Sequence, residues 1–154
     1  MIKIDMNDKN EKNYGFTLME ILVVMGIMVV LSTLGLLVGL DFYKRYAFNS
    51  ERDLVVSMLQ KARNQSLANI NQKPHGVKIE PGKYIVFEGL SYATRIQPAD
   101  QEFLAHPGIQ TDPPNMEVVF EQLSGGATPS LYFQLKNDKR SEPIEVNSEG
   151  RINW

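Results

Sequence analysis

The segment from Phe16 to Leu40 most constrains how this chain of 154 residues folds, because it is almost continuously apolar. Glu20 is the only charged residue within it. About 20 residues from Ile21 onward give a helix of roughly 30 Å, the thickness of the hydrocarbon core of a bilayer. A charge inside a membrane span is unfavourable, by about 2.5–3.5 kcal/mol at mid-depth and by less near the edge. The position of Glu20 at the entrance of this span therefore needs a specific explanation.

A secretory signal peptide and a plain membrane anchor are two ordinary interpretations of this segment. A signal peptide has an apolar core of about 7–15 residues that ends at a small-residue cleavage site. This segment is longer and lacks such an exit. A plain anchor takes its orientation from flanking Lys and Arg residues, which here lie on both sides and favour neither direction. An anchor whose C-terminal domain never assembles stays open as an alternative.

The composition limits the classes of function. The formal net charge is -2, so the overall charge does not favour nucleic acid or another polyanion as a partner. The chain has no cysteine, which excludes a thiol nucleophile, a zinc-cysteine site and disulfides. The sequence contains no Gly-x-Ser-x-Gly, no phosphate-binding glycine loop and no credible nucleophile with its base. We therefore expect no enzymatic activity and no cofactor.

A single long helix is predicted from Phe16 to Lys73, a range without proline. Its second half, residues 41–70, carries apolar side chains at helical spacing, namely Leu54 or Val55, Met58, Leu59, Ala62, Leu67 and Ile70. Polar residues fill much of the opposite face, so this half is amphipathic whereas the first half is apolar all round. Pro74 is expected to end the helix, because the residue before a proline disfavours the helical conformation.

The remainder of the chain is predicted to be β-structure. Strands at Val77–Ile79 and Tyr84–Phe87 flank Pro81-Gly82, which suits the centre of a type II turn, and so form a hairpin. Residues 90–115 are rich in proline and are predicted to be mainly a long loop. Further strands are expected at Glu117–Leu123, Leu131–Leu135, Pro143–Val146 and Arg151–Trp154. The predicted fold class is α+β, with the long N-terminal helix packed on a small antiparallel sheet.

Residues 15–25 resemble the processing site of type IV prepilins and type II secretion pseudopilins. The sequence Gly15-Phe16-Thr17-Leu18-Met19-Glu20 heads the predicted helix, and this combination is highly specific. In that family a membrane peptidase cuts after the glycine and methylates the new N-terminal residue. The resemblance implies a leader of residues 1–15, a cut between Gly15 and Phe16, N-methylation of Phe16, and recognition or assembly roles for Thr17, Leu18 and Glu20.

The resemblance also gives Glu20 a partner. Cleavage creates an α-amine at Phe16, a cation that needs an anion when helices pack into the apolar core of a filament. Glu20 of an adjacent subunit would supply that anion, and a subunit in the wrong axial position would leave both charges unpaired. The ordinary alternative is a glutamate that is mildly favoured by the N-terminus of its helix and extends outward.

The family further implies a pilin-like fold, a domain organisation, a location and partners. Residues 16–40 would form the transmembrane and assembly half of the helix, 41–73 its amphipathic half, and 74–154 an extracytoplasmic β domain. The chain would cross the cytoplasmic (inner) membrane once, with its leader in the cytoplasm, and then enter a pilus or pseudopilus. The implied partners are the prepilin peptidase/methyltransferase, other pilin or pseudopilin subunits and the inner-membrane assembly platform.

Two longer segments are similar to GspH/FimT-type pseudopilins and minor pilins. These are "ERDLVVSMLQKARNQSLANINQ" and the ending "PIEVNSEGRINW", in which a glycine-arginine pair starts the last strand. The expected function is therefore a structural subunit of a type IV pilus or a type II secretion pseudopilus. The alternative is a minor pilin that binds DNA or another ligand at a filament tip.

Several other residues are weaker candidates for function. Gly35 and Gly39 fit the small-xxx-small pattern of close helix packing, although glycine is common in membrane helices. The candidate DNA contacts are the basic residues near the C-terminus, Lys136, Lys139, Arg140 and Arg151. Asp138 and Glu142 dilute this basic cluster, and a charged hairpin turn is usually just solvated.

No metal site is predicted. His75 and His106 each lie beside a proline and lack the spacing of metal ligands, so both are expected to be solvated in loops. The acidic residues Asp100, Glu102 and Asp112 lack the pattern of a calcium-binding loop, and a solvated loop is expected there too.

Overall fold

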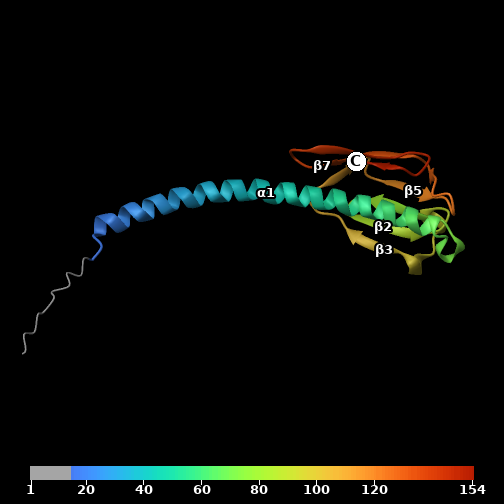
Figure 1. Ribbon diagram of the computed structural model, residues 1–154, viewed down its shortest axis with the longest axis horizontal. Helices are drawn as coiled ribbons and strands as arrows, with labels where there is room; N and C mark the ends of the chain where they lie inside the picture. Colours follow the sequence, from blue (N-terminus) through green and yellow to red (C-terminus); the bar gives the residue numbers. More distant parts are fainter. Residues whose placement is uncertain (1–14) are drawn as a thin grey trace, which may run out of the picture. The chain divides into compact units, whose positions relative to one another are not determined.

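The computed structural model describes residues 15–154, and for residues 36–40 the backbone only (Figure 1). By its internal contacts the chain divides into two units, Met1–Phe42 and Tyr43–Trp154. The long helix α1 (Leu18–Leu67) has 50 residues and confirms the prediction of one long N-terminal helix. Antiparallel sheets make up most of the second unit, so the fold class is α+β, as predicted.

Within the second unit, α1 buries one face. The buried apolar residues of this face recur at helical spacing, and they are Phe48, Val55, Met58, Leu59 and Ala62. The apolar positions predicted between 54 and 62 are therefore confirmed. The same face also buries two polar residues, Glu51 and Ser66, which the sequence analysis did not assign to the core.

The end of the helix differs from the prediction. α1 ends at Leu67 rather than at Lys73, and a short 3-10 helix, η1 (Ile70–Gln72), follows it. Asn69 has a φ of 53°, in the left-handed region that ends helices and that asparagine tolerates better than most residues. Leu67, the last residue of α1, is 38% exposed, and Ile70, which lies beyond the helix, is 43% exposed, so neither extends the buried apolar stripe as predicted.

The strands form two antiparallel sheets, whereas one sheet was predicted. The first sheet has the order β3-β2-β1-β5-β6 and the second has the order β4-β7-β8-β9. The strands are β1 (His75–Glu80), β2 (Lys83–Glu88), β3 (Gln101–Leu104), β4 (Gln110–Asp112), β5 (Met116–Phe120), β6 (Ala127–Thr128), β7 (Leu131–Lys136), β8 (Ser141–Val146) and β9 (Ile152–Asn153).

The predicted hairpin is present and the predicted loop is partly wrong. β1 and β2 pair in the register Glu80↔Lys83, and Gly82 occupies the turn with a φ of 84°. Residues 90–115 contain β3, β4 and two 3-10 helices, η2 (Tyr92–Thr94) and η3 (Gln97–Ala99), instead of one long loop. Both strands are short and lie at sheet edges, where β3 pairs with β2 and β4 pairs with β7.

One apolar core joins α1 to both sheets. The first sheet contributes alternate residues of its strands, including Val77 and Ile79 from β1 and Tyr84 and Val86 from β2. The second sheet contributes the inward-facing residues of β7 and β8, which are Leu131, Phe133, Leu135, Ile144 and Val146. The amphipathic half of α1 is therefore an integral part of the domain that carries the sheets.

Candidate processing and assembly site

Thr17 caps the start of α1. Its Oγ1 accepts a hydrogen bond from the backbone N–H of Glu20 over 3.2 Å, and its carbonyl accepts one from Ile21 over 3.2 Å. Threonine is a favoured N-cap residue, and a glutamate three positions later completes the sequence pattern of a capping box. Thr17 thus fixes where the helix begins. The sequence analysis missed this role, although the Thr-x-x-Glu spacing is visible in the sequence.

The first part of α1 is apolar and fully exposed. Leu18–Gly35 has a mean hydropathy of 2.3, and none of these residues is buried. By length and composition this helix can cross a membrane. Phe16, just before it, is 78% exposed. Exposed apolar surface of this extent is unfavourable in water, so it requires lipid or other apolar helices around it.

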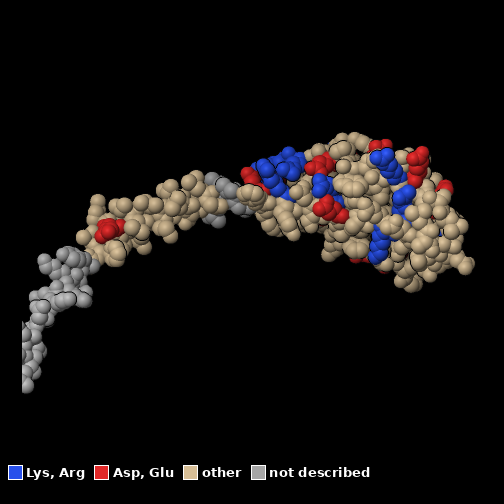
Figure 2. All heavy atoms as spheres, in the orientation of Figure 1, with Lys and Arg blue, Asp and Glu red and all other residues tan. Residues whose placement is uncertain are grey.

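Glu20 interrupts this apolar surface, and its side chain has no ion-pair partner within residues 15–154. The described part of the segment is uncharged in Figure 2 apart from one acidic group. Among residues 15–154 no ion pair involves the Glu20 carboxylate. The hydrogen bond to Thr17 uses the backbone of Glu20 and not its side chain. Any cation that pairs with Glu20 must therefore come from outside the described chain.

Gly15 and Phe16 lie in exposed, non-helical backbone immediately before α1. Apart from its chain neighbours, no atom of the described residues lies within 4 Å of the position that a Cβ on Gly15 would occupy. The bond between these two residues is therefore accessible and lies outside the hydrogen bonds of the helix. Exposed segments of this kind are the sites where proteases cut most readily.

Residues 11–36 match the family model of the prokaryotic N-terminal methylation motif. This match supports the prediction that the chain is a type IV prepilin or pseudopilin. This family consists of structural subunits rather than enzymes. Comparison with curated proteins and with solved structures gives no significant match. Because the matched residues do not include the sheets, the similarity to GspH/FimT-type proteins stays a prediction.

Gly35 and Gly39 were predicted to pack against other helices, and the structure describes the surroundings of Gly35 only. Apart from its chain neighbours and its own helical turn, no atom of the described residues lies within 4 Å of the position that a Cβ on Gly35 would occupy. A close contact there would have to come from another molecule. The surroundings of Gly39 lie outside the described side chains, and its packing role stays a prediction.

The structure does not bring the four predicted DNA-binding residues together. Lys136, Lys139 and Arg140 lie at the β7–β8 turn, whereas Arg151 follows the opposite end of β8. Lys136 also forms an ion pair with Asp112 of β4. Asp138, in the same turn, pairs with Lys44 of α1 over 3.8 Å. The turn is thus partly neutralised, and the six-residue strand β8 separates it from Arg151.

Arg151 instead lines a pocket at the other end of β8. A pocket of about 590 Å³ is lined by Arg151, Arg63 of α1, Trp154 and Glu149, among others. The Nε of Arg63 donates to the Gly125 carbonyl over 3.4 Å. Neither arginine forms an ion pair with a carboxylate in the part of the chain that the structure describes.

Of the groups expected to be solvated, His75 is buried and Asp100 is only partly exposed. His75 is the first residue of β1, where it pairs with Glu88 in the hairpin register, and it is 4% exposed. The Asp100 side chain is 11% exposed and accepts a hydrogen bond from Arg95 Nε over 2.7 Å. His106 does lie in a loop, where its Nδ1 accepts from the Gly108 N–H over 3.1 Å.

The other acidic residues of that prediction lie in strands. Glu102 of β3 pairs with Lys83 over 3.4 Å, and Asp112 lies in β4. Within residues 15–154 no three His, Cys, Asp or Glu side chains are grouped so as to hold a metal ion.

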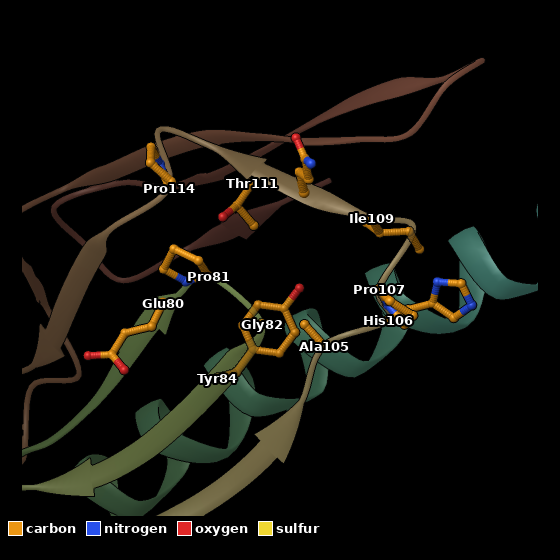
Figure 3. Close-up of a pocket in the computed structure, with 11 residues that line it drawn as sticks. Glu80, Pro81, Gly82, Tyr84, Ala105, His106, Pro107, Ile109, Thr111 and Pro114 are labelled. Atoms are coloured by element: carbon orange, nitrogen blue, oxygen red, sulfur yellow. The ribbon is translucent and has the colours of Figure 1, made fainter.

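A further cavity lies between the β1–β2 turn and the segment that leads to β4 (Figure 3). Its volume is about 260 Å³, and its lining includes Pro81, Tyr84, His106 and Pro107. Burial, together with the neighbouring Glu51 carboxylate, raises the pKa of the Tyr84 hydroxyl well above its usual value. The cavity holds no nucleophile paired with a base, so it gives no reason to assign a catalytic role.

Proposed function

We propose that the chain is a prepilin-like subunit that is cut between Gly15 and Phe16 and N-methylated at Phe16. Residues 1–15 are then its leader, and residues 16–40 insert into the membrane and later pack against other subunits of a type IV pilus or type II secretion pseudopilus. Residues 74–154, with the buried half of α1, form the extracytoplasmic domain. The observation that carries this proposal is the methylation motif at residues 11–36, which ends in an exposed apolar helix.

The proposed cut is tested by changing Gly15. The peptidase must approach the residue before the cut closely, and a side chain there would obstruct it. Gly15→Leu should leave the leader attached while membrane insertion proceeds. Gly26→Leu is the matched control, because Gly26 also has open space around it but lies within α1. Intact-mass measurement in a host that has the peptidase distinguishes the two, and normal processing of Gly15→Leu would refute the assigned site.

The proposed assembly contact joins Glu20 of one subunit to the Phe16 α-amine of another. Two observations support it, namely the absence of a cation beside Glu20 in the described chain and the apolar surface around it. Each charge is costly to transfer into an apolar filament core by itself, and pairing offsets this cost. Leaving one member of such a buried pair unmatched typically costs about 3–5 kcal/mol.

Glu20→Gln and Glu20→Ala test this contact. Because the cap of α1 uses the backbone N–H of Glu20, both variants keep the bond to Thr17 and the start of the helix. We expect normal cleavage and insertion but slow or failed assembly, measured as the yield of sheared filaments per membrane-inserted subunit. If both variants are processed and enter filaments as the wild type does, Glu20 is a tolerated edge residue and the pairing is wrong.

The pocket that Arg63 and Arg151 line favours a second candidate function, a minor pilin that binds DNA. Two guanidinium groups without carboxylate partners in the described chain suit phosphates, and Trp154 beside them, 60% exposed, suits base stacking. This site replaces the β7–β8 turn as the better candidate, because Lys136 already pairs with Asp112.

Salt-dependent binding of a single-stranded oligonucleotide by the full chain in detergent micelles tests this function. Arg63→Ala/Arg151→Ala should weaken binding and lower the slope of log affinity against log salt by about 1.4, or about 0.7 for each lost phosphate contact. Lys136→Ala/Lys139→Ala is the control that removes equal charge at the turn. The absence of wild-type binding at low salt would remove the DNA-binding candidate.

A further inference from the structure

The β7–β8 turn lies beside the part of α1 that begins the second unit. Asp138 of the turn forms an ion pair with Lys44 of α1 over 3.8 Å. Glu142, near the start of β8, pairs with Arg52 over 3.2 Å, about two helical turns further along α1. Both contacts lie within the second unit. β8 therefore runs along α1 with its turn at the end where α1 enters the domain (Figure 1).

This end of the domain stays close to the apolar run by chain length alone. The run ends at Leu40, and Tyr43, the first residue of the second unit, follows three residues later. Three residues span at most about 10 Å even when the chain is fully extended. Tyr43 is therefore near the membrane surface at any angle between the run and the domain. The distance is comparable with the Debye length of about 8 Å in physiological salt, so charges beside Tyr43 act on that surface.

Basic residues gather at this end of the domain. In Figure 2, Lys and Arg side chains cluster over the start of the second unit. The four basic residues of these segments are Lys44 and Arg45 of α1 and Lys139 and Arg140 of the turn. Two acidic residues of the same segments, Asp41 and Asp138, leave an excess of two positive charges. The side chains of Arg45 and Arg140 form no ion pair with a carboxylate within residues 15–154.

Two tyrosines lie on the same part of α1. Tyr43 and Tyr46 are three residues apart, so their side chains share one face of the helix. They are 64% and 74% exposed, so the domain does not cover them. Tyrosine is enriched where a membrane meets water, because its ring is apolar and its hydroxyl forms hydrogen bonds. Exposed tyrosines so soon after an apolar run therefore indicate a membrane interface.

We propose that this end of the domain binds anionic phospholipid headgroups in the leaflet from which the apolar run emerges. The basic side chains donate charge-assisted hydrogen bonds to lipid phosphates, and the tyrosine rings lie at headgroup level. The inference rests on the proposed membrane insertion of residues 16–40. It gives the basic turn a partner other than DNA and holds the domain against the membrane before assembly. The residues of this headgroup surface are Tyr43, Lys44, Arg45, Tyr46, Lys139 and Arg140.

Depth-dependent quenching of a single tryptophan tests the contact with the membrane. The full chain is reconstituted in phosphatidylcholine vesicles with about 30% phosphatidylglycerol, which gives a negative surface potential. Because the chain has one tryptophan, Tyr46→Trp/Trp154→Phe places its only tryptophan on the headgroup surface. Lipids brominated near the headgroup end of their acyl chains should quench it more than lipids brominated at the tail end. In the matched control, Leu31→Trp/Trp154→Phe, the tryptophan is in the apolar run, and tail-end bromine should quench it most.

The two variants distinguish failure of this inference from failure of the proposed function. Quenching in the Leu31→Trp variant but not in the Tyr46→Trp variant would show an inserted helix whose domain stays away from the membrane. That result would refute the headgroup surface and leave the proposed function intact. The absence of quenching in the Leu31→Trp variant would refute the proposed membrane insertion, and this inference with it.

Amide exchange of the β7–β8 turn tests the role of charge. The N–H groups of Lys139 and Arg140 donate to Asn137 Oδ1 over 3.0 and 2.8 Å, so Asn137 holds the turn when the basic side chains are replaced. In the wild type, these amides should exchange more slowly on vesicles with phosphatidylglycerol than on phosphatidylcholine alone. Each basic side chain near an anionic surface favours docking by about fivefold, so Lys139→Gln/Arg140→Gln should weaken it by about 25-fold and remove the difference.

Arg63→Gln/Arg151→Gln is the control for the charge test, because it removes equal charge from the pocket at the other end of β8. This variant should keep the difference between the two kinds of vesicle. Equal exchange on both kinds of vesicle in the wild type would show that anionic headgroups are not bound, and would refute the proposal. An equal loss of the difference in both variants would also refute it, because the overall charge of the chain would then account for the effect.

Discussion

Replacing Gly150 by alanine should strongly destabilise the sheet domain. Gly150 has a φ of 75°, and a Cβ on it would lie 1.9 Å from the carbonyl oxygen of Gly125. Its N–H also donates to the Asn147 carbonyl over 2.9 Å, so the residue cannot move away without breaking this turn. The left-handed conformation costs a residue with a Cβ about 1–2 kcal/mol. Relief of the overlap by backbone displacement adds about 1–3 kcal/mol, which makes the expected loss about 2–5 kcal/mol.

Gly82→Ala is the matched control for this prediction. Gly82 has a similar φ of 84°, but no atom lies within 4 Å of its Cβ position, so only the conformational cost applies. Urea unfolding of the full chain in micelles, followed by Trp154 fluorescence and circular dichroism, measures both variants. With a urea dependence of about 1–3 kcal/mol per M, the midpoints should differ by about 1 M. Equal losses in the two variants would show that the Gly125 carbonyl moves freely, and would refute the reasoning.

Two further predictions concern pH and the helix cap. Because burial lowers the pKa of His75, the unfolded state binds more protons than the folded state just below about pH 6.5, and stability should fall as the pH decreases there. His75→Gln should flatten this pH dependence in urea titrations, and an unchanged slope would contradict it. Thr17→Val should cost the first turn of α1 about 1 kcal/mol, whereas Thr17→Ser should keep the cap. Amide exchange of Glu20 reports the difference, and equal exchange in both variants would exclude the cap.

The features that depend on local pattern could be predicted from the sequence. The long helix follows from the absence of proline and the regular spacing of Val55, Met58 and Ala62. The β1–β2 hairpin follows from the Pro81-Gly82 turn between two apolar runs. The candidate cleavage site follows from a motif of consecutive residues, and the matched family supports that motif.

The features that depend on distant pairing could not be predicted in the same way. The strands divide into two sheets because β1 pairs with β5 and β4 pairs with β7. The two strands of each pair are far apart in sequence and are not joined by a turn. β3 and β4 have four and three residues, too few for an alternating pattern to stand out. The place of His75 in a strand could have been predicted, because extending the predicted hairpin symmetrically from its turn pairs His75 with Glu88.

The position of the cap relative to the proposed cut has a consequence for how the subunit changes state. Both hydrogen bonds that start α1, from Glu20 N–H to Thr17 Oγ1 and from Ile21 N–H to the Thr17 carbonyl, lie on the C-terminal side of the Gly15–Phe16 bond. Removal of the leader therefore breaks one covalent bond and none of these helical contacts. We therefore expect the helix of the processed subunit to begin at Leu18, as it does in the full chain. If the proposed cut is right, the mature subunit should differ from its precursor by a new terminal charge and not by a new helix, so the signal for assembly would be chemical rather than conformational.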